Sequence, residues 1–198
     1  MHYLTLRIPS HFQLTDDELY DLCVANRELK IEKNAHGEIF VISPTGAETG
    51  NLNSSLNAIL WNWNQKHQRS AARLGKTFDS STGFRLNNGA MRSPDAAWVT
   101  NKHWEALSVT ERKKFAPLCP DFVIELLSES DKREELQEKM NEWIANGCRL
   151  GWLIDPGRKQ VYIYKPQQNN PMVQPFSEKL KGGKALPGFE VDLQQILL

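Results

Sequence analysis

The sequence predicts one α/β (α+β) domain over residues 1–198, in which helices flank a sheet. Three observations lead to this fold class. The chain has the length of one ordinary domain, and its 40% hydrophobic content is enough to form a core. Residues 51–67 carry the apolar stripe of an amphipathic helix. Residues 121–127 form a nearly continuous apolar run, which is typical of a central buried strand.

The N-terminal part predicts a helix followed by a hairpin. Thr15 and Glu18 form the pattern of a capping box, which opens a short helix that ends near residue 26. Residues 29–32 and 38–43 are two strand candidates, and Gly37 supplies the positive φ that the turn between them needs. The long helix over 51–67 follows, with apolar residues at helical spacing: Leu52, Leu56, Ile59, Leu60 and Trp63.

The remaining elements are shorter. Strands are expected at 76–86, broken by Gly83, and at 93–100, and a polar helix at 102–115 leads into the buried strand at 121–127. Asp131 and Glu134 suggest a second capping box, which opens a helix that ends at Asn146-Gly147. Strands at 150–154 and 161–164 follow, joined by a turn through Asp155, and the apolar tail at 191–198 is expected to dock.

The composition excludes several classes of protein. Lys plus Arg equals Asp plus Glu at 24 each, so the overall charge favours neither a polyanion nor a membrane, although local cation clusters can still bind phosphate. No apolar run approaches the roughly 20 residues of a membrane span. Three widely spaced cysteines suggest neither disulfides nor zinc, and favour the cytoplasm. Gly75-Lys76-Thr77 resembles a P-loop end, but Ser70 replaces its first glycine, so no nucleotide cofactor is expected.

Two acids in strand-like segments predict a metal site. Glu125 interrupts the buried run at 121–127, where an ionised carboxylate is costly unless it is paired or binds a metal. Asp95 begins a second strand-like segment, so the two carboxylates could meet if these strands are neighbours. Two carboxylates suit Mg²⁺, which completes its shell with water and substrate phosphate. A salt-bridged Glu125 and a turn-capping Asp95 explain the same pattern equally well.

Lys139 is the candidate cation of this site. It lies beside the buried stripe of the predicted helix, formed by Leu136, Met140 and Trp143, so its side chain can point toward the sheet. The alternative is a lysine that extends past the core to water, which is the commoner outcome for an isolated lysine.

Several motifs together resemble a known family. They are Ser93-Pro94-Asp95, Pro120-Asp121-Phe122-Val123-Ile124-Glu125-Leu126-Leu127-Ser128, Glu138-Lys139, and the stretch from Asn146-Gly147 to Asp155-Pro156. In this combination the chain resembles the Uma-two family of restriction endonucleases, which belongs to the PD-(D/E)xK superfamily. The resemblance extends from the hairpin to Leu186-Pro187-Gly188-Phe189.

The resemblance implies a restriction endonuclease-like core, a mixed sheet flanked by helices. It makes Asp95 the first acid of the motif and Glu125 the second. The motif's usual lysine position, two residues after Glu125, is Leu127 here, so Lys139 from the next helix takes that role by the resemblance. Glu48 looks like the extra acid that many members carry on their first core helix, although an acid at a helix start also favours the helix dipole.

These residues predict a metal-dependent endonuclease that hydrolyses phosphodiester bonds in DNA. Asp95, Glu125 and the Leu126 carbonyl, with Glu48 as a further acid, are expected to hold Mg²⁺, for which Mn²⁺ can substitute. Lys139 is expected to orient or deprotonate the attacking water, with a pKa lowered by burial. A homodimer is expected, because cutting both strands needs two sites. Two alternatives remain: a non-catalytic nucleic-acid-binding or regulatory protein, and a structural domain in which Glu125 and Lys139 form a buried pair.

Overall fold

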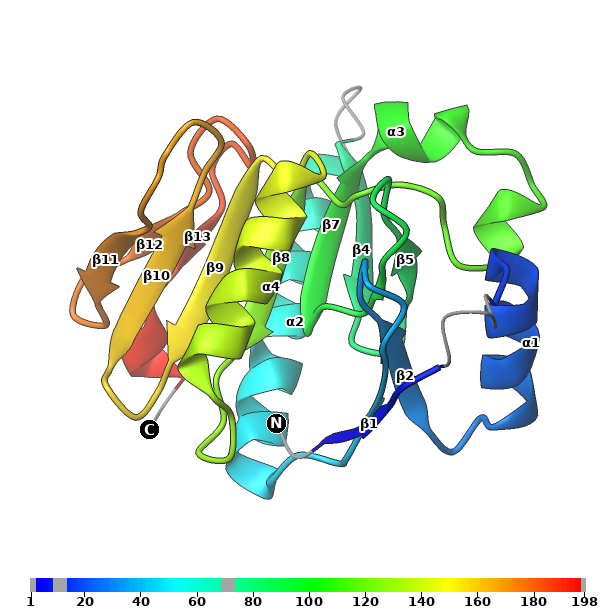
Figure 1. Cartoon of the computed structure of the whole chain (residues 1–198). Coiled ribbons are helices and arrows are strands. Elements are labelled where there is room, and N and C mark those ends of the chain that lie inside the picture. Colours follow the sequence, from blue (N-terminus) through cyan, green and yellow to red (C-terminus); the bar gives the residue numbers. More distant parts are fainter. Residues whose placement is uncertain (1–2, 9–13, 69–73, 197–198) are drawn as a thin grey trace.

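The computed structural model describes residues 3–8, 14–68 and 74–196, without the side chains of 67 and 68 (Figure 1). Its helices are α1 (Asp16–Ala25), α2 (Ala47–Gln68), α3 (Asn101–Ala106) and α4 (Arg133–Ala145), with 3-10 turns at Glu111–Lys113 and Leu193–Gln195. Its strands are β1 (Tyr3–Leu6), β2 (Lys30–Lys33), β3 (Ile39–Ile42), β4 (Gly75–Asp79), β5 (Phe84–Arg85), β6 (Met91–Arg92), β7 (Ala96–Thr100), β8 (Phe122–Leu126), β9 (Leu150–Asp155), β10 (Gln160–Tyr164), β11 (Met172–Pro175), β12 (Leu180–Lys181) and β13 (Glu190–Val191).

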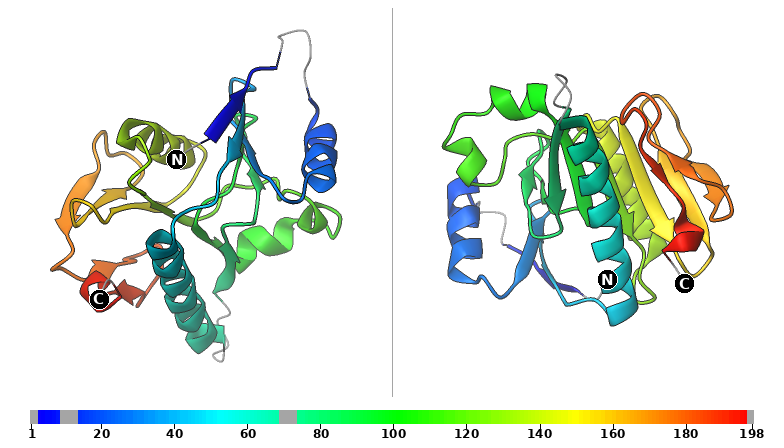
Figure 2. Two further views of the ribbon diagram at one scale, coloured as in Figure 1. Left: turned by 90° about the horizontal axis from the view of Figure 1, so that it is seen from below. Right: turned by 180° about the vertical axis from the view of Figure 1, so that it is seen from behind.

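A six-stranded mixed sheet forms the centre of the molecule. Its order is β11-β10-β9-β8-β7-β4, with β8 and β9 parallel and the other neighbours antiparallel. Helices α4 and α2 cover opposite faces of this sheet (Figures 1 and 2). The predicted fold class, a mixed sheet flanked by helices, is therefore confirmed.

A second sheet, of order β1-β3-β2-β6-β5, brings the N-terminal hairpin beside the central sheet. It packs on α1 through a small apolar cluster that includes Leu19, Ile31 and Met91. Residues 93–95 connect β6 of this sheet directly to β7 of the central sheet. The Ser93-Pro94-Asp95 motif therefore lies where the chain crosses from one sheet to the other.

The long helix α2 covers one face of the central sheet, as its apolar stripe predicts. Leu52, Leu56, Leu60 and Trp63 are all buried in one cluster with residues of β7, β8 and β9. The C-terminal segment docks against the same cluster through Val191 and Leu193, which confirms that part of the prediction; residues 197–198 lie outside the described chain. The helix begins at Ala47, four residues before the predicted start.

Several local predictions are confirmed. The capping box of Thr15 and Glu18 is present at the start of α1, and β2 pairs with β3 as an antiparallel hairpin. Helix α4 ends at Ala145, with Asn146 as its C-cap and Gly147 following at a φ of 111°. All three cysteines are free.

Among the helices that the structure describes, none combines the length and the apolar character needed to span a membrane.

Two local predictions are wrong, and a third is only partly right. Asp131 does not cap α4, because its Oδ2 accepts a hydrogen bond from the Ser128 N–H at 2.7 Å and Lys132 occupies the cap position. The polar helix at 102–115 is two short pieces, because Leu107 is extended and Ser108 and Glu111 cap a separate turn. The break expected at Gly83 in the strand at 76–86 is present, but it already begins with a turn at Asp79, and β4 and β5 belong to different sheets.

Candidate active site

The two predicted acids meet at one end of the central sheet. Strands β7 and β8 pair with Ala96 opposite Ile124, which places Asp95 beside the end of β8. The Asp95 carboxylate accepts a hydrogen bond from the Leu126 N–H at 2.8 Å. From the other face, the Asn57 amide of α2 donates to the Asp95 carbonyl at 3.0 Å. Asp95 is therefore fixed on both its side chain and its backbone, next to Glu125.

Glu125 is a buried carboxylate held by helix α4. It is 1% exposed, and its Oε1 accepts a hydrogen bond from the Trp143 indole at 2.9 Å. The Lys139 ammonium lies 2.9 Å from the same oxygen. Lys139 and Trp143 are one helical turn apart, so both donors come from one face of α4. The other oxygen, Oε2, receives no hydrogen bond from the residues that the structure describes.

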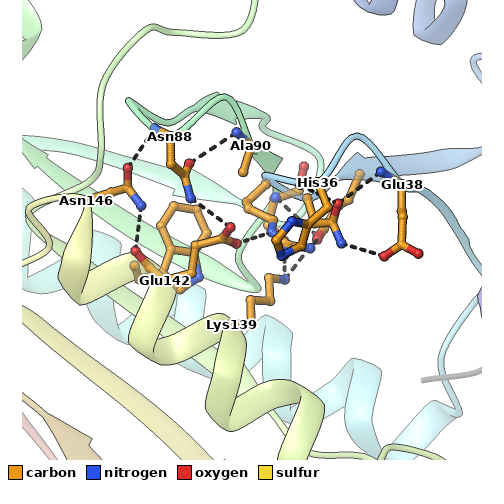
Figure 3. A network of polar contacts seen from close by, with 12 residues as sticks. His36, Glu38, Asn88, Ala90, Lys139, Glu142 and Asn146 are labelled. Carbon is orange, nitrogen blue, oxygen red and sulfur yellow. Dashed lines mark hydrogen bonds and ion pairs between the residues drawn. The ribbon is translucent and has the colours of Figure 1, made fainter. Parts of the chain in front are cut away.

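Lys139 points into the protein rather than to water. It is 7% exposed, and besides Glu125 its ammonium contacts the Glu32 carboxylate at 3.0 Å and the Ser93 carbonyl at 3.4 Å. Figure 3 shows its side chain leaving α4 toward the hairpin and the segment before β7. The alternative of a lysine extending to solvent is therefore wrong. The structure brings Asp95, Glu125 and Lys139 together, whereas their catalytic roles stay predictions.

Glu32 is a site residue that the sequence did not reveal. It lies on β2, is 2% exposed, and uses both carboxylate oxygens. Oε1 accepts from the Lys139 ammonium and from the Ser93 N–H at 3.2 Å, and Oε2 lies 3.3 Å from the Arg92 guanidinium. The only local signal was Arg92, directly before the Ser93-Pro94-Asp95 motif. A cation that is buried there needs an acid nearby.

An outer layer of polar contacts surrounds this cluster (Figure 3). Arg92 Nε contacts the Glu142 carboxylate of α4 at 2.5 Å. Glu142 also accepts from the Asn88 amide at 3.0 Å, and the Asn88 N–H donates to the Asn146 side chain at 3.1 Å. These contacts tie α4 to the 86–90 turn and to Arg92, and so hold the helix that carries Lys139.

Burial and neighbouring charges shift the pKa values of Glu125, Glu32 and Lys139. Burial raises the pKa of Glu125 to about 7; Lys139 opposes this rise, and the carboxylates of Asp95 and Glu32 add to it. Burial also disfavours the charged form of Glu32, but Lys139 and Arg92 outweigh it and lower the Glu32 pKa. For Lys139, burial is outweighed by Glu125 and Glu32, which raise the pKa.

The raised pKa of Lys139 corrects one expectation. A lysine buried alone would lose its proton more easily, and this was the basis for expecting a general base. Here two carboxylates face the ammonium, so the prediction of a lowered pKa is wrong. In this arrangement Lys139 is a cation that donates hydrogen bonds.

The remaining predicted residues are less closely tied to the cluster. Glu48 lies in the first turn of α2, exposed, and its side chain makes neither a hydrogen bond nor an ion pair within the described part of the chain. The Leu126 N–H is used by Asp95, while metal binding by the Leu126 carbonyl stays a prediction. Asp155 is a turn residue as expected, since it accepts from the Arg158 N–H, and it also lies 3.4 Å from Arg133.

The cluster fits a divalent cation chemically. With every group ionised, its four carboxylates (Asp95, Glu125, Glu32, Glu142) and three cations (Lys139, Arg92, Lys30) leave a net charge of −1. Among the described residues, the donors to Glu125 all reach its Oε1, and a second carboxylate, that of Asp95, repels the charge of Glu125. Nowhere in residues 3–8, 14–68 and 74–196 do three or more His, Cys, Asp or Glu side chains form a metal-binding group. Two carboxylates plus water are, however, a sufficient protein shell for Mg²⁺.

A mixed sheet with two acids at the end of neighbouring strands, faced by a helix-borne lysine, defines a protein of the restriction endonuclease-like class. The model of the Uma2 family, described as "Putative restriction endonuclease", matches residues 16–194, and the chain belongs to this family. Among solved structures it resembles "a putative nuclease belonging to DUF820" from Anabaena variabilis ATCC 29413. The TM-score is 0.69 at 19% identity, over 86% of this chain and 93% of the other. No curated protein matches the sequence.

Proposed function

We propose that the protein is a metal-dependent endonuclease that hydrolyses phosphodiester bonds in DNA, with Asp95, Glu125 and Lys139 as its catalytic residues. The observation that carries this proposal is the Lys139 ammonium, 2.9 Å from a buried carboxylate whose neighbour is a second carboxylate. A purely structural ion pair needs one acid for one lysine. The surplus of acids at this point is what a divalent cation and a phosphate substrate would use.

Asp95 and Glu125, with the Leu126 carbonyl, would hold Mg²⁺ or, in its place, Mn²⁺. When bound, the metal would activate a water molecule and neutralise charge that develops on the phosphate. Glu48 remains a proposed further acid; its position in the first turn of α2 also suits the helix dipole.

The chain's own residues would position the reacting groups. The Trp143 indole fixes the orientation of the Glu125 carboxylate, and the Leu126 N–H fixes that of Asp95. Lys139 stays protonated between two acids, so it would donate a hydrogen bond to the attacking water or to a phosphate oxygen. This preorganisation is valuable because charge develops on the phosphate in a site from which water is largely excluded.

The distribution of charge supports a nucleic acid as the substrate. Residues 156–186 hold six cations and one acid, a net charge of +5 that the rest of the chain balances. Two of the cations, Arg158 and Lys159, are exposed in the turn after β9. Because Glu125 and Leu126 pair with Leu153 and Ile154 of β9, this turn lies at the same sheet end as the acids. Phosphate groups could therefore approach the site along this turn.

A homodimer in the cytoplasm completes the proposal. Double-strand cleavage needs two active sites, which a two-fold symmetric dimer supplies. The three free cysteines are compatible with a reducing compartment. Light scattering on the purified protein, alone and with a short duplex, would test the dimer.

The test of the function is a cleavage assay on duplex, single-stranded and branched DNA and on RNA, with Mg²⁺, Mn²⁺ or EDTA. Wild type should cleave DNA only with metal, and Asp95→Asn, Glu125→Gln and Lys139→Met should lose cleavage while remaining folded. If wild type cleaves none of these substrates with either metal, the proposal is overturned. DNA binding that survives in all three variants, without cleavage by wild type, would indicate the non-catalytic binding protein instead.

A further inference from the structure

Glu32 lies between Lys139 and the segment that carries Asp95, although it belongs to a different sheet. One of its oxygens accepts from both the Lys139 ammonium, at 3.0 Å, and the Ser93 N–H, at 3.2 Å. The side chain is 2% exposed, so these bonds are not exchanged for bonds to water. Glu32 thus contacts two parts of the proposed site at once.

The second partner of Lys139 is Glu125, which is also a proposed metal ligand. When a cation occupies the site, Glu125 would have to satisfy both the metal and the ammonium. Glu32 removes this conflict, because it holds the ammonium independently of Glu125. Without Glu32, the described residues would leave Lys139 with Glu125 as its sole carboxylate partner.

We propose that Glu32 is a positioning residue of the active site, which holds Lys139 in place and so leaves the Glu125 carboxylate available to a divalent cation. The inference rests on the proposed metal-dependent function. It assigns the N-terminal hairpin a part in the chemistry, since β2 supplies the carboxylate that orients a cation on α4. Groups that orient the residues around a metal commonly change its affinity by about 10- to 100-fold when removed.

Calorimetric titration of Mn²⁺ into metal-free protein tests this role without a substrate. Glu32→Gln should weaken Mn²⁺ binding by about tenfold or more, because Lys139 then competes for Glu125. The double variant Glu32→Gln with Lys139→Met should recover affinity, because no ammonium remains to compete. Glu38→Gln is the matched control: Glu38 lies in the same hairpin as Glu32, but it contacts Asn34 and Arg7 rather than Lys139. It should bind Mn²⁺ like wild type.

A spectroscopic readout keeps the test independent of metal binding. In ¹⁵N-lysine-labelled, metal-free protein, the buried Lys139 ammonium should give a slowly exchanging NH₃⁺ signal that Lys139→Met removes. Glu38→Gln should keep this signal, and Glu32→Gln should shift or broaden it beyond detection. Glu32→Asp, which keeps the charge, should restore part of it. An unchanged signal in Glu32→Gln would overturn the positioning role, as would wild-type Mn²⁺ affinity in that variant.

The two proposals fail in distinguishable ways. Wild type that binds Mn²⁺ and cleaves DNA, with Glu32→Gln unaltered in affinity and NH₃⁺ signal, overturns only the role of Glu32. Wild type that binds no metal overturns the proposed function together with the metal-directed part of the role. The NH₃⁺ signals then still decide whether Glu32 holds Lys139.

Discussion

Strand β8 has a buried acid at each end, and the two differ in what surrounds them. Asp121, just before the strand, is 1% exposed and accepts from the Thr100 N–H at 2.8 Å and contacts His103 at 3.1 Å. Its side-chain neighbours, His103 and Arg149, are about half exposed. Glu125, at the other end, is equally buried, but its cation is buried too and a second carboxylate lies beside it.

The comparison teaches that burial of a carboxylate does not by itself mark a functional site. Asp121 uses Oδ2 for the Thr100 N–H and His103, whereas its Oδ1 accepts no hydrogen bond within the described part of the chain and lies 3.8 Å from the Arg149 guanidinium. Both side-chain partners reach water, and neither is a second carboxylate. Glu125 instead belongs to a cluster with more acids than cations. Variants at the two ends of one strand can therefore separate structure from function.

The largest expected effect is on cleavage. Asp95→Asn and Glu125→Gln should each lower metal-dependent cleavage by at least about a hundredfold, because a proposed metal ligand is lost while the side-chain volume is kept. Asp121→Asn, at the other end of the strand, should stay within about threefold of wild type once stability is matched, since it contacts no reacting group. Initial cleavage rates at saturating Mg²⁺ provide the measurement. Equal losses at both ends would contradict the distinction.

The next effect is on stability. Lys139→Met removes the ammonium from two buried carboxylates, so the free energy of unfolding should fall by about 3 to 5 kcal/mol. His103→Ala removes an exposed partner of Asp121 and should cost less than about 1 kcal/mol. Urea unfolding followed by tryptophan fluorescence, in EDTA at pH 7, measures both. A small loss for Lys139→Met would mean that its ion pairs contribute little to folding.

The next effect is on the pH dependence of stability, through the raised pKa of Glu125. Burial raises the pKa of Glu125 from an ordinary 4.5 to about 7, so between these values the folded protein binds a proton that the unfolded chain has released. The contribution of Glu125 to the free energy of unfolding is therefore unfavourable and grows as pH rises through this window. In EDTA, Glu125→Gln should lose less stability than wild type between pH 5 and pH 8. A steeper decline in the variant would show the opposite shift.

The smallest effect concerns the basic turn. Arg158 and Lys159 lie at the sheet end of Glu125, whereas Lys165 follows β10 at the opposite end of that strand. Lys159→Ala should reduce the salt dependence of DNA binding, measured as the slope of log affinity against log salt, by about one. Lys165→Ala should leave that slope unchanged. Fluorescence anisotropy with a labelled duplex at several salt concentrations would compare the two variants. Equal slopes would show that DNA does not bind specifically along the turn after β9.

Much of the site could be predicted because it depends on local signals. Glu125 interrupts an apolar run, Asp95 follows a proline at a strand start, and Lys139 lies beside a helical stripe. Glu32 could not be found in this way. In the segment Lys30-Ile31-Glu32-Lys33, alternation predicts that Ile31 is buried and Glu32 exposed, yet both are buried.

The reason is tertiary packing. Glu32 is covered by Lys139 from α4 and by Arg92 and Ser93, which are 60 or more residues away along the chain. The direction of the Lys139 pKa shift was predicted wrongly for the same reason. It depends on two carboxylates, and the sequence indicated only Glu125. The failed capping box at Asp131 differs, because there a local competitor, the Ser128 N–H, takes the carboxylate.

The participation of β2 has a consequence for how the protein can be shortened. The central sheet with α2 and α4 carries all three proposed catalytic residues, and a fragment beginning at residue 47 would retain Asp95, Glu125 and Lys139. Such a fragment would nevertheless lose Glu32 and leave Arg92 and Lys139 each without one acid. In the intact protein, any transient detachment of the hairpin would also separate Glu32 from Lys139, so local opening there would remove the proposed positioning of Lys139 without unfolding the core.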